Sequence, residues 1–206
     1  MSDDLSQAYQ VVSTRTAFRG AVVSLRLDQV RMSDGSLAER EVVEHPGSVG
    51  ILALDEADNV VLVNQYRHPV RARLDELPAG LLDVAGESAL AGARRELAEE
   101  AGLTAATWHV LLDLHVSPGI STEAIRIYLA RDLQPAAPDG DFAAEHEELT
   151  LTVRRVPLSE AVQAVLSGAI TNAAAVAGLL AADRARAGGW GRLRPADTPW
   201  PARPEH

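Results

Sequence analysis

The sequence has no cysteine among its 206 residues. Disulfide bonds, metal sites built on thiolates and cysteine nucleophiles are therefore excluded. Long apolar runs are also missing, and no stretch approaches the ~20 residues that a membrane-spanning helix needs. The start of the chain, MSDDLSQAYQ, has neither a basic opening nor an apolar centre, so we expect no signal peptide. These absences favour a cytoplasmic protein that does not bind membranes.

Basic residues are fewer than acidic residues in this sequence. Lysine and arginine together number 19 against 29 acidic residues, which gives a formal net charge of −10. Such a chain is poorly suited to non-specific binding of nucleic acids or anionic membranes, although a few local arginines could still hold a small anion. Hydrophobic residues make up 47% and charged residues 23% of the chain, as in ordinary globular proteins. The length suffices for one large domain, or for a domain with a small extension.

The first 46 residues have the pattern of β-strands. Residues 9–18 and 21–32 are rich in valine and leucine with partial alternation. Asp34 and Gly35 mark a tight turn that leads into a third strand-like run. A β-segment of this size has too little apolar surface for a core of its own. We therefore expect this segment to pack against another surface.

Strands and helices mix along residues 47–187 without strict alternation, which predicts an α+β fold rather than a Rossmann domain. The run at residues 60–63 is continuously apolar, as expected for a strand covered on both faces. Residues 74–87 are interrupted by a proline and two glycines and are predicted to form a loop. The tail, residues 188–206, is rich in proline and is expected to be irregular or disordered. Helices are predicted at 88–101, 158–167 and 172–187.

The predicted helix at 88–101 carries a group of acids near its end. At about 100° per residue, Glu96, Glu99 and Glu100 project from one side of the helix. The simplest interpretation is a solvated face whose repulsion is eased by neighbouring arginines. Two features point elsewhere: the helix dipole disfavours anions in the last turns, and the glycine-rich loop before the helix ends in a fourth acid, Glu87. Carboxylates gathered in this way suit a hard divalent cation such as Mg²⁺ or Mn²⁺.

The stretch from Gly80 to Leu103 resembles the signature of Nudix hydrolases. That signature is a glycine, five residues, a glutamate, seven residues and then a fixed pattern that ends in Glu-Glu-x-Gly and an aliphatic residue. In this sequence six residues instead of five separate Gly80 from Glu87, so the loop has one extra residue. The second half matches at every fixed position. It reads Arg95-Glu96-Leu97-Ala98-Glu99-Glu100-Ala101-Gly102-Leu103.

The resemblance implies an α/β/α sandwich over residues 47–187, in which the signature forms a loop, a helix and a second loop. It also implies hydrolysis of a nucleoside diphosphate linked to another group. Metal ions in such an enzyme bridge the diphosphate and lower the pKa of the attacking water. The implied metal ligands are oxygen atoms of the signature and of the turn before it. They are Glu96 and Glu100, a further ligand Glu99, and the backbone carbonyl of Ala79.

Catalytic roles other than metal binding follow from the same resemblance. Arg95 is expected to orient the glutamates and Glu99 to act with it, while Glu87 supports the arrangement. A glutamate of the predicted loop 132–148 is expected to position or deprotonate the attacking water. The first candidate is Glu147, and the alternatives are Glu145 and Glu148.

Outside the signature, the sequence resembles the branch of the family that hydrolyses ADP-ribose to AMP and ribose 5-phosphate, and most of all its actinobacterial members. Arg67 ends a Gln-aromatic-Arg stretch and would contact a phosphate or the terminal ribose. Glu76 begins the ELPAG stretch that leads into the signature. Pro118 follows Gly102 by sixteen positions, the spacing of that branch. The predicted substrate contacts are Arg67, Glu76, Pro118 and Gly119.

Members of this branch are homodimers in which the N-terminal segment crosses the two-fold axis. Residues 1–46 are therefore expected to serve in dimerisation and in the substrate site, and the need to cover a small exposed sheet agrees with this. Two alternatives stay open. One is a pyrophosphatase for another nucleotide sugar or a dinucleotide, and the other is a non-catalytic sensor that binds ADP-ribose and regulates a partner. The complete set of signature acids argues against the sensor.

Overall fold

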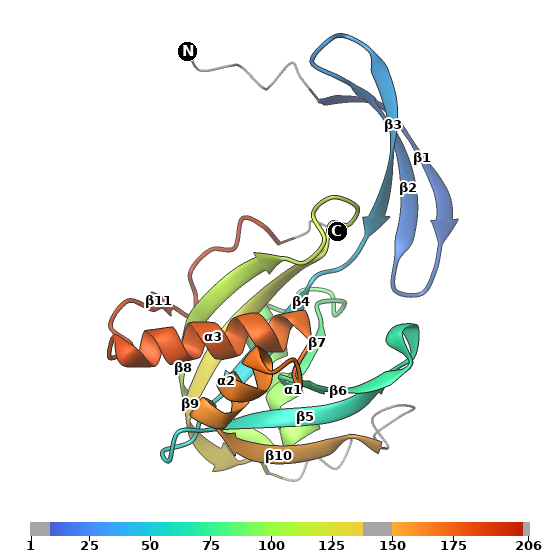
Figure 1. Cartoon of the computed structure of the whole chain (residues 1–206). Helices are drawn as coiled ribbons and strands as arrows, with labels where there is room; N and C mark the ends of the chain where they lie inside the picture. Colours follow the sequence, from blue (N-terminus) through green and yellow to red (C-terminus); the bar gives the residue numbers. More distant parts are fainter. Residues whose placement is uncertain (1–8, 138–149, 204–206) are drawn as a thin grey trace. The chain divides into compact units, whose positions relative to one another are not determined.

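The computed structural model describes residues 9–137 and 150–203, and Figure 1 shows the order of their elements along the chain. The chain divides into two compact units. Most of the first unit is N-terminal, whereas the second holds the α-helices. The first unit comprises Met1–Gly47, His115–Ala124 and Arg203–His206, and the second comprises Ser48–Leu114 and Ile125–Ala202.

The first unit is built on a three-stranded antiparallel sheet, in agreement with the predicted N-terminal β-segment. Its strands, in sheet order, are β1 (Gln10–Arg19), β2 (Ser24–Arg31) and β3 (Leu37–Glu44). The turn between β2 and β3 has Gly35 at φ +83°, a conformation that glycine adopts without strain. The Asp34 carboxylate accepts hydrogen bonds from the amide and the hydroxyl of Ser36 and fixes that turn.

Residues 115–124 also belong to the first unit, where β3 holds them. Val43 of β3 donates to the carbonyl of Ile120 at 2.8 Å and accepts from the amide of Thr122 at 2.9 Å. The two predicted substrate contacts in this segment, Pro118 and Gly119, precede these bonds directly. Their turn is therefore positioned by the N-terminal sheet.

The second unit contains two sheets, one of five strands and one of three. Their strands are β4 (Ser48–Ala53), β5 (Asn59–Arg67), β6 (Ala72–Glu76), β7 (Ala79–Leu81), β8 (Leu103–His115), β9 (Ala124–Pro135), β10 (Thr152–Pro157) and β11 (Arg194–Pro195). The larger sheet has the order β11-β8-β9-β4-β7, with β4 parallel to β9 and antiparallel to β7. In the smaller sheet β5 lies between β10 and β6 and is antiparallel to both.

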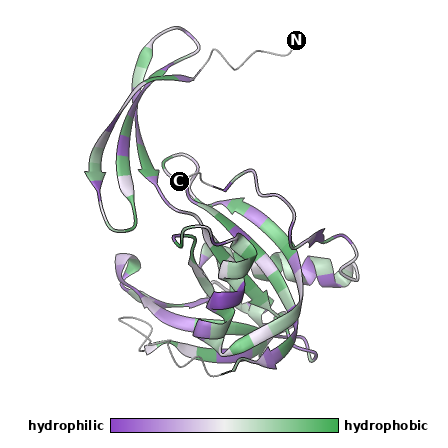
Figure 2. Ribbon diagram, turned by 180° about the vertical axis from the view of Figure 1, so that it is seen from behind, coloured by the Kyte–Doolittle hydropathy of each residue, from purple (hydrophilic) through white to green (hydrophobic). Residues whose placement is uncertain are grey.

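Helices cover both sides of β5, which gives the α/β/α arrangement that the resemblance implied. They are α1 (Ala89–Ala101), α2 (Leu158–Leu166) and α3 (Ala173–Ala187). Val60 and Leu62 pack with residues of α2 and α3, whereas Val61 packs with residues of α1. Residues 60–63 are all 0% exposed, so the predicted strand covered on both faces is confirmed. Figure 2 shows hydrophobic residues (green) along these inner strands, and none of the described helices has the length and hydropathy of a membrane span.

Residues 74–81 do not form the loop that their proline and glycine predicted. β6 continues to Glu76, and β7 then pairs with β4, so the chain changes sheets between these strands. Pro78 lies at the crossing, where its missing amide hydrogen needs no partner, and its carbonyl accepts from the amide of Ile51 at 2.8 Å. The turn-forming residues of this stretch mark a change of sheet rather than an irregular segment.

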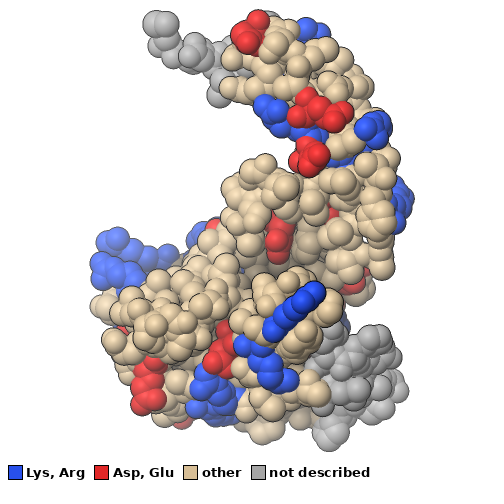
Figure 3. All heavy atoms as spheres, turned by 45° about the vertical axis from the view of Figure 1, so that its right-hand side comes forward, with Lys and Arg blue, Asp and Glu red and all other residues tan. Residues whose placement is uncertain are grey.

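Ion pairs join distant elements on the surface of the second unit. Arg155 of β10 contacts Asp55 at 3.1 Å, and Arg186 of α3 contacts Asp58 at 2.9 Å. Figure 3 shows basic side chains (blue) beside acidic ones (red) on the face turned forward. Exposed pairs of this kind contribute little stability each, because water screens them.

A buried arginine anchors the C-terminal tail, which the sequence predicted to be irregular or disordered. Arg126 of β9 is 2% exposed and donates to both carboxylate oxygens of Asp113, at 2.7 and 3.1 Å. It also donates to the carbonyls of Thr198 at 2.6 Å and Pro199 at 3.2 Å. Its guanidinium lies 5.0 Å from the ring centre of Trp200. Together with the pairing of β11 to β8, these contacts hold the described part of the tail against the five-stranded sheet.

Replacing Arg126 with methionine should strongly destabilise the second unit. The change removes one of the two arginines that donate to Asp113 and leaves two tail carbonyls without their donor, and breaking a buried ion pair from one side costs about 3–5 kcal/mol. Urea unfolding measures this loss. Arg154→Met is the matched control, because Arg154 is 49% exposed where it pairs with Asp75 and such a pair contributes about 0–1 kcal/mol. Equal losses in both variants would contradict the anchoring role of Arg126.

The same contact predicts a loss of stability in acid. Burial by itself raises the pKa of Asp113, but hydrogen bonds from Arg126 and Arg194 outweigh burial and keep this pKa below the ordinary value of 3.8. A carboxyl whose pKa is lower in the folded state contributes stability above its unfolded pKa and loses it as the pH falls through the folded pKa. From about pH 5 downward, the wild type should therefore lose more unfolding free energy than Asp113→Asn. Parallel pH profiles for the two chains would contradict this prediction.

Candidate active site

Helix α1 is built so that its polar side carries the signature acids. Ser88 precedes the helix, and its hydroxyl accepts a hydrogen bond from an amide of the first turn at 3.1 Å. Gly102 ends the helix with φ +62°, the left-handed conformation typical of this position. Leu97 is 0% exposed and belongs to the core. The predicted helix is confirmed, and at about 100° per residue its three glutamates lie within about 100° of one another around its axis.

Arg95 lies among these acids. Its guanidinium donates to Glu87 through two nitrogens, each at 3.1 Å, to Glu96 at 2.6 Å and to Glu99 at 2.9 Å. The hydrogen bonds to Glu87 raise the pKa of Arg95; burial opposes this, and the charge of Glu96 adds to it, so the pKa lies above its ordinary value. Arg95 is thus a permanent positive charge that contacts three acids at once.

The neighbouring Arg94 points elsewhere. Its guanidinium lies 5.9 Å from the ring centre of Trp108 on β8. Consecutive residues on a helix project about 100° apart, so two adjacent arginines cannot both face the same group of acids. Arg95 therefore contacts the carboxylates, whereas Arg94 packs against the ring of Trp108.

The turn before the helix touches the acids directly. The amide of Ala79 donates to a carboxylate oxygen of Glu100 at 2.9 Å. A Cβ added at Gly80 would lie 1.9 Å from Oε1 and 2.6 Å from Cγ of Glu96. Because even the stem of the glutamate would clash, only glycine leaves room for this side chain where it lies.

A second glycine has a similar purpose and was missed by the sequence analysis. Gly92 lies inside α1, and a Cβ there would come within 2.9 Å of Oε2 of Glu87. The only signal in the sequence is a glycine in a helix interior, where glycine lowers stability by about 1 kcal/mol relative to alanine. Because Gly92 has no side chain, the carboxylate of Glu87 can approach the helix and accept hydrogen bonds from Arg95.

The chemistry of this cluster fits a hard divalent cation. Three carboxylates, from Glu87, Glu96 and Glu99, contact one guanidinium, and Glu100 follows Glu96 by one helical turn, so the formal charge of the cluster is 1 − 4, or −3. The side chains of Glu96 and Glu99 are only 12% and 22% exposed, so water screens their repulsion incompletely. All the donors are oxygens, which Mg²⁺ and Mn²⁺ prefer. Among residues 9–137 and 150–203, no three His, Asp or Glu side chains have the arrangement of a metal site, and the acids are tied instead to Arg95 and the Ala79 amide.

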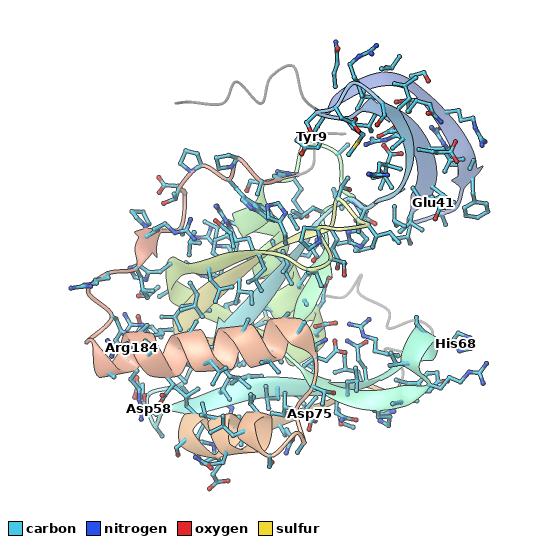
Figure 4. All side chains as sticks on the ribbon, turned by 45° about the horizontal axis from the view of Figure 1, so that its top comes forward. Tyr9, Glu41, Asp58, His68, Asp75 and Arg184 are labelled. Atoms are coloured by element: carbon cyan, nitrogen blue, oxygen red, sulfur yellow. The ribbon has the colours of Figure 1, made fainter. Side chains whose placement is uncertain are left out.

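A second polar cluster lies at the end of β5. Arg67 donates to both carboxylate oxygens of Glu76, at distances from 2.6 to 3.2 Å. Glu76 is 2% exposed and therefore holds Arg67 in a fixed orientation. The short 3-10 helix η1 (His68–Val70) follows, and Figure 4 shows His68 at this end of the hairpin, pointing outward. The structure thus brings together two of the four predicted substrate contacts.

The remaining predicted site residues lie elsewhere. Pro118 and Gly119 belong to the first unit. The candidates for the residue that activates water, Glu145, Glu147 and Glu148, lie outside the residues that the structure describes. Their roles therefore stay predictions.

Comparisons with known proteins match both parts of the chain. A family model described as the NUDIX domain matches residues 44–177, and one described as the nucleoside diphosphate sugar hydrolase N-terminal domain matches residues 9–43. The chain is 48% identical to an ADP-ribose pyrophosphatase of Mycobacterium tuberculosis, over 95% of this chain and 93% of the relative.

Further relatives are less similar in sequence. A methanol dehydrogenase activator of Bacillus methanolicus is 36% identical, and an ADP-ribose pyrophosphatase of Bacillus subtilis is 33% identical, each over 69% of this chain and 78% of the relative. A crystal structure of an ADP compounds hydrolase is similar with a TM-score of 0.74 and 25% identity, covering 90% of this chain and 97% of that one.

Adding one methyl group at Gly80 tests the geometry of the acids. Gly80→Ala should force Glu96 out of its position and weaken Mn²⁺ binding by about tenfold or more, as changes next to metal ligands usually do. Isothermal titration with Mn²⁺ measures the affinity. Gly191→Ala is the matched control, since nothing lies within 4 Å of a Cβ at that position. An unchanged affinity in Gly80→Ala would show that the place of Glu96 does not matter for metal binding.

Proposed function

The chain belongs to the Nudix family, and on this premise we propose that it hydrolyses the diphosphate of ADP-ribose to AMP and ribose 5-phosphate. The observation that carries the proposal is the cluster around Arg95, where the acids of the family signature lie beside Ala79 and Gly80. Relatives with the name ADP-ribose pyrophosphatase support the choice of substrate, and one of them matches nearly the whole chain.

We propose Glu96, Glu99, Glu100 and the carbonyl of Ala79 as the ligands of Mg²⁺ or Mn²⁺. When bound, the ion supplies positive charge to the diphosphate and lowers the pKa of a water molecule. The chain itself positions the ligands, because Arg95 contacts Glu96 and Glu99 while the Ala79 amide contacts Glu100. Groups that are in place before the reaction need little reorganisation during it, which is the main source of electrostatic catalysis.

The proton of the attacking water needs an acceptor within hydrogen-bond reach. We propose a glutamate of the segment before β10, with Glu147 as the first candidate and Glu145 and Glu148 as alternatives. Substrate contacts outside the signature are proposed for four residues, in which Glu76 acts by orienting Arg67. They are Arg67, Glu76, Pro118 and Gly119.

The first unit has a surface that favours a homodimer. β1 is exposed along its whole length, and it presents apolar side chains: Phe18 is 59% exposed, and Val11 and Val12 are 49% exposed. Apolar residues on the edge strand of so small a sheet favour coverage by a protein partner. We propose that a second copy of the chain covers this sheet and that the enzyme acts in the cytoplasm.

A regulatory role is the second candidate, because the relative from Bacillus methanolicus has the name methanol dehydrogenase activator. In that case the chain would bind or cleave a nucleotide and act on a partner enzyme. A third possibility keeps the chemistry and changes the substrate to another nucleotide sugar or a dinucleotide. Measuring the rate at which the chain cleaves each candidate substrate separately distinguishes these three functions.

The purified chain with Mg²⁺ should cleave ADP-ribose faster than GDP-mannose, NADH or diadenosine polyphosphates, and the products should be AMP and ribose 5-phosphate. Glu96→Gln should lower kcat by about 10²–10³-fold, because it weakens the proposed site for the cation that would neutralise charge on the diphosphate. Ion-exchange chromatography of the products measures both results. The matched control is Glu160→Gln, which changes an exposed glutamate of α2 and should leave kcat unchanged.

Two outcomes would contradict the proposal in different ways. Fast cleavage of another substrate alone would keep the enzyme class and change the substrate. Tight binding of ADP-ribose without cleavage of any substrate would favour the regulatory role.

A further inference from the structure

One arginine of the second unit connects the strands of the three-stranded sheet. Arg73 of β6 donates through Nε to the side-chain oxygen of Asn64 on β5 at 2.7 Å. Its terminal nitrogens donate to the carbonyl of Asn64 at 2.8 Å, to the carbonyl of Thr150 at 2.7 Å and to the hydroxyl of Thr150 at 3.3 Å. Thr150 leads into β10, which pairs with β5 on the side opposite to β6 (Figure 1). One guanidinium thus ties β6 to β5 and to the residue that leads into β10.

Neutral groups, and not carboxylates, accept the hydrogen bonds of Arg73. They are two backbone carbonyls, an amide oxygen and a hydroxyl, and no acid among residues 9–137 and 150–203 pairs with this arginine. A guanidinium presents its donors in a rigid planar fork, so it fixes the relative positions of acceptors that belong to different segments. Arg73 therefore holds Thr150 at a defined place beside Asn64 and compensates no negative charge.

The amide of Asn64 is itself held from its other end. Asn64 donates to Asp75 of β6 at 2.9 Å, and Asp75 also accepts from Arg154 of β10 at 2.5 Å; Figure 4 labels Asp75 along this hairpin. An amide that donates at one end and accepts at the other has a determined orientation. The middle of β5 is buried in the core, so Arg73 connects Thr150 to a strand that is firmly packed.

Thr150 follows the segment that carries the proposed water-activating glutamates. Glu147 precedes Thr150 by three positions, and the alternatives Glu145 and Glu148 precede it by five and by two. An extended chain spans at most about 3.6 Å per residue, so the backbone of Glu147 lies within about 11 Å of Thr150. Because a displacement of about 1 Å at a reacting group can lower the rate about 10²-fold, the anchor of so short a connection affects catalysis.

We propose that Arg73 is a positioning residue for the reaction. By holding Thr150 against Asn64, it sets the place of the glutamate that accepts the proton of the attacking water. This inference rests on the proposed function and deepens it, because it gives a role in the reaction to an arginine that lies outside the family signature.

Arg73→Met tests the proposal, because methionine keeps part of the apolar stem and removes all four hydrogen bonds. kcat for ADP-ribose should fall by about 10–10²-fold as the base is displaced, whereas KM should stay close to the wild-type value, since Arg73 is not among the proposed substrate contacts. The melting temperature should change little, because Arg73 is exposed. Arg73→Lys should restore only part of kcat, since one ammonium group does not reproduce the fork of the guanidinium.

Arg154→Met is the matched control. Arg154 belongs to the same group of contacts and is also exposed, but it donates to Asp75 and not to Thr150. Its kcat should match that of the wild type. Equal losses of kcat in Arg73→Met and Arg154→Met would overturn the inference, and so would a lower melting temperature of Arg73→Met with an unchanged kcat, because either result assigns Arg73 a purely structural role.

A double-mutant cycle distinguishes positioning of the base from other losses of activity. In the background of Glu147→Gln, Arg73→Met should lower kcat no further, because the group that Arg73 positions has already been removed. If Glu145 or Glu148 is the base, the effect of Arg73→Met should disappear in the background of that variant instead. An effect of full size in all three backgrounds would overturn the inference. The proposed function fails in a different way, in which the wild-type chain itself cleaves no ADP-ribose.

Discussion

The contact of Arg95 with three carboxylates is the interaction on which the rest of the site depends. Without a positive charge among them, the glutamates at the end of α1 would repel one another and the helix dipole would disfavour them. With it, the acids are held in place and still leave an excess of negative charge for a cation. The glycines at 80 and 92 have the complementary role, because they leave room for Glu96 and Glu87 to approach from both sides. The positive charge of Arg95 and the absence of side chains at Gly80 and Gly92 thus allow the acids to lie where they do.

The strand β5 connects this site to the core. Its middle residues are buried between α1 on one side and α2 and α3 on the other, so the strand is held rigidly. Its end carries Gln65 and Arg67 on the face that it shares with Glu76, and β6 then leads within a few residues to Ala79 and Gly80. Metal ligands and proposed substrate contacts are therefore placed by the same continuous backbone. Sites built on packed strands keep their geometry better than sites built on loops.

Local patterns in the sequence were sufficient for much of this. Helix α1, its cap at Ser88 and its end at Gly102 depend on interactions within a few residues, and the acids on one side of it follow from the helical period. The apolar run of β5 was enough to predict burial on both faces. The stretch at 74–81 was misread because proline and glycine usually indicate turns, whereas here they lie where the chain crosses from β6 to β7. The pairing of β7 with β4 is a contact between segments about 30 residues apart, and no local pattern reports it.

The sequence by itself determined the chemistry of this protein: the family signature, the oxygen donors for a divalent cation and the helix that carries them. Only the tertiary structure decided which groups meet. It placed Arg95 rather than Arg94 among the acids, joined the Ala79 amide to Glu100 and buried Arg126 under the C-terminal tail. The physical reason is that the period of a helix or strand depends on neighbours in the chain, whereas burial and hydrogen bonding depend on segments that are distant in sequence and close in space.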